Sequence, residues 1–187
     1  NGGLQNIPPG QGFWVRVKDG TPASAVVDLT FSNANRTHNA KDEFFKSSEE
    51  VNNEYQFSMF ATSDGITDET VLVFDNASLP QFDYEFDAYK FQAYERNIPN
   101  IYFIGANDER LAIDTRPQTP TVGVGFNMNQ SANNVKISVK EAPNFAAIVL
   151  EDLLNGEKTD LLENDYIFNY VKSQATNRFK LHFSFLG

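Results

Sequence analysis

The sequence predicts an all-β protein with two packed antiparallel sheets, a two-layer β-sandwich of jelly-roll type. Three observations indicate this class. Apolar residues alternate with polar ones in one segment after another, as they do in strands that bury a single face. The 17 Phe, 7 Tyr and 1 Trp favour strands over helices. No segment carries an apolar stripe long enough for three turns of a helix. Sheets that are apolar on one side close most economically by packing face to face.

The alternating segments follow one another along most of the chain, and turn residues separate them. The first places Phe13, Val15 and Val17 on one face and Trp14 on the other. The second comes after a Gly-Thr-Pro turn at 20–22, which is typical of a chain reversal. The predicted strands are 13–18, 27–31, 55–61, 70–74, 101–104, 111–113, 122–126, 135–140, 147–150, 166–170 and 178–185.

The last predicted strand, 178–185, has the clearest apolar face. Phe179, Leu181, Phe183 and Phe185 project to the same side, so we expect Phe183 to be a structural residue of the core. No internal repeat and no low-complexity linker divides the chain, which predicts a single domain over residues 1–187. Because the chain starts at Asn1 without a leader-like segment, we expect a mature product or a fragment of a longer secreted protein.

Composition excludes several classes of function. The chain has 15 Lys and Arg against 25 Asp and Glu, a net charge of −10, which disfavours nucleic acids and anionic lipids as partners. Cysteine is absent and only His38 and His182 occur, so cysteine nucleophiles, disulfides and multi-histidine metal centres are excluded. No apolar stretch reaches the ~18 residues that a membrane span needs. No nucleophile motif or phosphate loop is present, and we expect no catalytic activity.

The densest acidic cluster is a candidate calcium site. Asp83, Glu85 and Asp87 lie in a polar segment that follows Asp75, and carboxylate oxygens are the ligands that calcium prefers. The alternative is a solvated acidic loop, ordered because Phe82, Tyr84 and Phe86 are anchored in the core. We prefer this second interpretation, since these aromatic rings require burial somewhere. Calcium is therefore the one cofactor that the sequence leaves open.

Three other features have plain structural interpretations. Trp14 is expected to lie in a strand that is covered on both faces, although an exposed ring would offer a platform for sugars. Arg36 and Asp87 are expected to hold loops through hydrogen bonds rather than to bind substrate. Gly123 and Gly125 are expected to let their strand pack closely against another backbone.

Six short segments resemble, in the same order, a pattern found in large secreted surface proteins of Bacteroidetes. They are Ile-Pro-Pro-Gly-Gln-Gly-Phe-Trp-Val at 7–15, Phe-Ser-Asn-Ala-Asn-Arg at 31–36, Asp-Glu-Thr-Val-Leu-Val-Phe at 68–74, Phe-Asp-Tyr-Glu-Phe-Asp-Ala-Tyr-Lys at 82–90, Val-Leu-Glu-Asp-Leu-Leu-Asn-Gly at 149–156 and Asn-Arg-Phe-Lys-Leu-His-Phe at 177–183. In those proteins the module precedes a sorting domain for type IX secretion.

The resemblance implies a non-catalytic module of a secreted or cell-surface protein, used for adhesion, display or spacing. It implies neighbouring domains in the same precursor, and it supplies no catalytic residue. The alternative is a carbohydrate-binding module attached to a secreted enzyme, with calcium as an added stabiliser. Either function predicts a surface polysaccharide or a protein as ligand.

Overall fold

The computed structural model describes residues 15, 17, 20–35, 55–92 and 97–186. The chain forms two compact units, one of Gly2–Val51 and one of Asn52–Gly187 together with Asn1. Each unit is held by its own internal contacts. Nearly all the described secondary structure belongs to the second, larger unit.

The described part of the smaller unit contains turns and one short helix. The amide of Ala25 donates a hydrogen bond to the carbonyl of Pro22 (2.9 Å), which closes the predicted turn. The 3-10 helix η1 spans Asn33–Asn35. The strand predicted at 27–31 is wrong, because these residues pair with no neighbouring strand in the described part of the chain. The prediction for 13–18 falls outside the described residues, except for Val15 and Val17.

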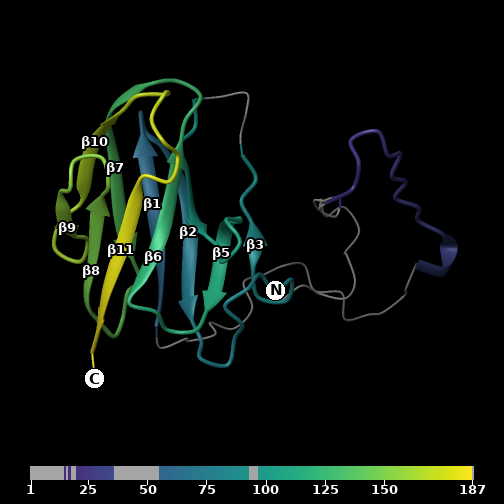
Figure 1. Cartoon of the computed structure of the whole chain (residues 1–187), viewed down its shortest axis with the longest axis horizontal. Coiled ribbons are helices and arrows are strands. Elements are labelled where there is room, and N and C mark those ends of the chain that lie inside the picture. The colour runs from purple at the N-terminus through teal and green to yellow at the C-terminus, as the bar shows by residue number, and fades with distance from the viewer. Residues whose placement is uncertain (1–14, 16, 18–19, 36–54, 93–96, 187) are drawn as a thin grey trace. The chain divides into compact units, whose positions relative to one another are not determined.

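The larger unit consists of strands, which confirms the all-β class (Figure 1). The predicted segments from 55–61 onward all coincide with strands, and the short strands β3 and β9 were not predicted. The strands are β1 (Gln56–Ser63), β2 (Ile66–Phe74), β3 (Ala88–Tyr89), β4 (Asn100–Ile104), β5 (Arg110–Arg116), β6 (Thr121–Asn127), β7 (Ala132–Lys140), β8 (Phe145–Asp152), β9 (Lys158–Asp160), β10 (Tyr166–Tyr170) and β11 (Phe179–Phe185).

The strands form one hydrogen-bonded sheet rather than two separate ones. Its order is β10-β7-β1-β2-β5-β4-β6-β11-β8-β9, with β3 paired to β5. Strand β5 joins the strands that precede it in this order to those that follow it. Its Arg110 and Leu111 pair with β4, while residues 113–116 run parallel to β2. The other pairs are antiparallel. The sheet curls until it is nearly closed into a barrel (Figure 1).

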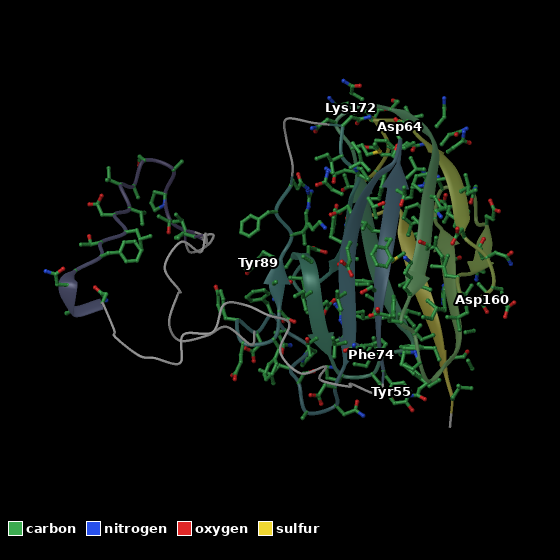
Figure 2. All side chains as sticks on the ribbon, turned by 180° about the vertical axis from the view of Figure 1, so that it is seen from behind. Tyr55, Asp64, Phe74, Tyr89, Asp160 and Lys172 are labelled. Carbon is green, nitrogen blue, oxygen red and sulfur yellow. The ribbon has the colours of Figure 1, made fainter. Side chains whose placement is uncertain are left out.

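The interior is filled by the apolar face of each strand. Strand β1 buries Phe57, Met59 and Ala61, as the period-two pattern predicts. In the last strand, Phe179 and Leu181 are buried, whereas Phe183 and Phe185 are half-buried and pack against the core. Figure 2 shows Tyr55 and Phe74 at one end of the sheet, where aromatic rings gather, and Asp64 and Lys172 at the other.

Gly125 makes room for a side chain, not for another backbone as predicted. Tyr102 of β4 lies opposite Gly125 of β6, and a Cβ at Gly125 would overlap the Cε2, Cζ and hydroxyl oxygen of that ring. Tyr102 is fully buried, although it belongs to the outer face of β4. A glycine in a strand interior loses side-chain packing, and here the tyrosine of the neighbouring strand restores it.

We therefore expect Gly125→Ala to lower the free energy of unfolding by about 1–3 kcal/mol, since Tyr102 must shift within a packed surface. Urea denaturation measures this change. Gly123→Ala is the matched control, because the nearest atom is the tip of the flexible Ile104 side chain, 3.1 Å away. Adding Gly125→Ala to Tyr102→Ala should cost little more than Tyr102→Ala alone. Equal losses for the two glycine variants would contradict the proposed packing.

Candidate functional site

The predicted calcium ligands lie in the loop between β2 and β3, and the structure gives them separate tasks. Asp87 is buried, and its carboxylate accepts hydrogen bonds from the amides of Asp83 and Thr115, both at 2.7 Å. Asp83 accepts the amide of Glu85 at 2.9 Å, while the Glu85 side chain is exposed. The described residues contain no group of three or more His, Asp or Glu side chains that could hold a metal ion. Calcium stays the one cofactor that the sequence leaves open, and the Asp87 carboxylate holds two backbone amides of this region.

The aromatic residues of this loop behave differently from the prediction. Tyr84 is 65% exposed and Phe86 is 45% exposed, so these two rings do not anchor the loop in the core. Phe82 is half-buried and stacks on Tyr89, with ring centroids 4.1 Å apart. Tyr84 and Phe86 stay exposed because Asp87 is the residue of this loop that is buried. In a segment without a strand partner, its carboxylate satisfies two backbone amides that would otherwise lack acceptors.

We call the exposed side of residues 79–91 the aromatic surface. Its large exposed side chains are Leu79, Tyr84, Phe86 and Phe91. Figure 2 shows Tyr89, on β3, at the margin of the larger unit. Large apolar side chains that stay exposed close together in one segment make that segment a candidate for an interaction site.

Electrostatically, the aromatic surface is acidic. The one basic residue of segment 79–91, Lys90, is nearly buried and bonds to Asp68 (2.6 Å) and to the carbonyl of Glu69 (2.8 Å). The carboxylates of Asp83 and Glu85 lie between the aromatic residues in sequence. The aromatic surface therefore offers aromatic rings and hydrogen-bond acceptors, while the Lys90 ammonium group is bonded to Asp68 and Glu69.

A buried ion pair lies where the two margins of the sheet approach each other. Arg178 donates from Nη2 to Asp152 at 2.6 Å and from Nε to both carboxylate oxygens at 3.0 Å. Tyr166 of β10 donates to the same carboxylate at 2.8 Å. The Arg178 guanidinium also lies 4.3 Å from the ring centroid of Phe168. Burial raises the pKa of Asp152, but the hydrogen bonds from Arg178, the Leu154 amide and Tyr166 bring it below its usual value.

A second ion pair joins Asp114 and Arg116, both on β5. Arg116 also donates to the carbonyl of Ile104 at 3.0 Å, which ties β5 to the end of β4. Burial raises the pKa of Asp114 despite the opposing hydrogen bonds and charge of Arg116. The Asp152–Arg178 pair and the bond from Arg116 to Ile104 thus each link different parts of the sheet and stabilise the fold.

His182, one of the two histidines noted in the sequence, contacts Glu151 on the adjacent strand. The two side chains are 2.6 Å apart, and Lys158 of β9 lies 3.6 Å from the same carboxylate. The hydrogen bond with His182, followed by the charge of Lys158, lowers the pKa of Glu151 although desolvation opposes it. This trio is partly exposed on the outer face of the sheet.

We expect His182→Ala to raise the pKa of Glu151, because the hydrogen bond that stabilises the ionised carboxylate is lost. The titration of the Glu151 carboxyl carbon, followed by NMR, measures the shift. Lys158→Ala is the control and should raise that pKa less. A depressed pKa gives stability that is present at neutral pH and lost as the pH falls through the folded-state value. An unchanged Glu151 titration would mean that the contact does not form in solution.

The remaining predicted structural residues are Trp14, Arg36 and Phe183. Trp14 and Arg36 lie outside the described residues. Phe183 packs on Phe74 and Phe57, with ring centroids 5.1 Å and 5.9 Å apart. Sequence reasoning missed the Asp152–Arg178 pair, although the alternation of Ile148 and Leu150 continues inward to position 152 and could have indicated a buried acid.

Comparison with known proteins adds one match. Residues 2–183 match the model of a family described as a domain of unknown function, DUF8693, and the matched range includes residues of both units. No curated protein and no solved structure matches the chain. In the part of the chain that the structure describes, no helix has the length and apolar character of a membrane span.

Proposed function

We propose that the chain, which belongs to the DUF8693 family, is a non-catalytic module of a secreted or cell-surface protein that serves adhesion, display or spacing. The observation that carries this proposal is the aromatic surface, where apolar rings stay exposed on a segment that buried bonds hold in place. Secretion, surface attachment and neighbouring domains in one precursor are supported by the resemblance of the six sequence segments described above.

The way this loop is held supports a binding role. Asp87 links the loop to Thr115, and the Thr115 hydroxyl donates back to the carbonyl of Phe86 at 3.1 Å. The amides of Phe86 and Asp87 both bond to the carbonyl of Asp83. Loops fixed on a rigid scaffold are common carriers of binding sites. Such a loop orders few groups when a ligand binds, which lowers the entropic cost of association.

We further propose that the nearly closed sheet is flattened into two layers, as in a jelly roll. Aromatic contacts across the interior support this arrangement. Phe57 of β1 lies 5.5 Å from Phe145 of β8, and Phe126 of β6 lies 5.3 Å from Phe168 of β10. One half, β10-β7-β1-β2, then faces the other, β6-β11-β8, and β5 with β4 forms the connection between them.

The second candidate function is a carbohydrate-binding module attached to a secreted enzyme. The exposed rings of Tyr84 and Phe86 favour it, because aromatic faces pack on the apolar faces of sugar rings while carboxylates accept hydroxyl hydrogens. Calcium would add stability here. A melting midpoint raised by several degrees at saturating calcium, and restored by a chelator, would support that role.

The test is a binding assay with the purified chain on panels of neutral polysaccharides and of polypeptides. We expect retention by the wild type and its loss in Tyr84→Ala/Phe86→Ala. Ile167→Ala removes a side chain that is 60% exposed on β10 and is the matched control. Cleavage of any retained polymer, or binding that survives in the double variant, would overturn the proposal. Retention by polysaccharides alone would favour the second candidate.

A further inference from the structure

We infer that the aromatic surface binds a polypeptide segment that presents arginine side chains. This inference rests on the proposed binding function and names the chemistry of the partner. It is built on three features of the aromatic surface and of Asp75, which precedes it: the sign of their exposed charges, the order of rings and carboxylates, and the hydrogen bonds that hold the turn.

The exposed charges of this segment are of one sign. Asp75 and Glu85 are exposed and Asp83 is half-buried, while Lys90 is nearly buried against Asp68. The whole chain has a net charge of −10. Such a potential draws cations toward the surface and repels anionic polymers such as acidic polysaccharides.

Aromatic rings and carboxylates alternate along residues 82–87, and these are the two kinds of group that a guanidinium binds. Glu85 lies between Tyr84 and Phe86 in one turn, and the amide of Glu85 is fixed by Asp83 at 2.9 Å. An arginine side chain can stack on an aromatic face and at the same time donate to a carboxylate. This protein already uses the same combination internally, where Arg178 lies 4.3 Å from the ring centroid of Phe168 and bonds to Asp152.

Arginine is favoured over lysine for a geometric reason. The guanidinium is planar, so one face packs on a ring while its N–H groups point in the plane toward a carboxylate. A lysine ammonium is a compact and strongly hydrated charge that gains less from the ring. The surface therefore should distinguish two peptides of equal charge.

The experiment is isothermal titration of the whole chain with hexa-arginine, hexa-lysine and hexa-glycine peptides at low ionic strength, with soluble mannan, xylan and β-glucan in parallel. We expect hexa-arginine to bind most tightly, hexa-lysine more weakly and hexa-glycine not at all. Glu85→Gln and Phe86→Ala should each weaken hexa-arginine binding roughly two- to fivefold. Glu163→Gln is the matched control, because it removes one exposed carboxylate outside this surface.

Each other outcome contradicts the inference in a distinct way. An equal loss in Glu163→Gln and Glu85→Gln would show non-specific attraction to the net charge. Equal binding of hexa-arginine and hexa-lysine would show that the aromatic rings do not contribute to recognition of the peptide. Binding of a neutral polysaccharide that Phe86→Ala abolishes, without binding of hexa-arginine, would overturn the inference and leave the proposed binding function intact. If Tyr84→Ala/Phe86→Ala loses none of the ligands on either panel, the proposed function itself fails.

Discussion

Replacing Arg178 with Met is expected to lower the free energy of unfolding by about 3–5 kcal/mol, because it leaves a buried carboxylate without its partner. Asp152 is fully buried and Arg178 is 5% exposed, so water cannot take the place of the lost guanidinium. In the wild type the guanidinium lies over the rings of Phe168 and Phe179, and methionine puts an unbranched apolar side chain beside them without its charge. The measurement is chemical denaturation at neutral pH, with circular dichroism as the readout.

Two controls separate the lost ion pair from lost packing. In Arg178→Met/Asp152→Asn the buried charge is gone, so the double variant should be more stable than Arg178→Met alone. The pH dependence gives the second control. The pKa of Asp152 is lowered in the folded wild type, so its contribution is present at neutral pH and lost as the pH falls through that folded value. The difference between wild type and Arg178→Met should therefore shrink in acid. A loss below about 1 kcal/mol, or one that is constant with pH, contradicts this account.

The sequence predicted the larger unit well because its strands bury one face. The alternation of apolar and polar residues in 55–61 and 135–140 reflects the face of the strand to which each side chain points. Strands β1 and β7 bury the apolar face that this alternation predicts. The same pattern failed at 27–31. A strand needs a partner ladder as well as a periodic sequence, and no alternation reveals whether such a partner exists.

The candidate site was harder to predict because its parts come from different places in the chain. The segment 82–87 alternates rings with acids, and period two places either set inward. The structure buries Asp87 and exposes Tyr84 and Phe86, because the amide of Thr115, 28 residues away in sequence, supplies a hydrogen bond. Local pattern contains no information about this amide. The antiparallel pairing of β3 with β5, which sets Ala88 opposite Ile113, brings it there.

The second large effect is expected for Phe57→Ala, which should cost about 3–5 kcal/mol. Phe57 is 1% exposed and makes edge-on contacts with Phe103 and Phe145, with centroids 6.1 Å and 5.5 Å apart. Phe183→Ala is the comparison, since Phe183 is in the same aromatic group but only half-buried. Because the cost of truncation grows with the apolar surface removed from water, Phe183→Ala should cost clearly less.

The pair of variants also tests how the two halves of the sheet meet. Phe57 lies on β1 and Phe183 on β11, 5.9 Å apart between ring centroids, so their contact crosses the interior. A double-mutant cycle measured by urea denaturation should give a coupling of about 0.5–1.5 kcal/mol for such an aromatic pair. Strict additivity would mean that β1 and β11 do not face each other. A larger loss for Phe183→Ala than for Phe57→Ala would contradict the half-buried position of Phe183.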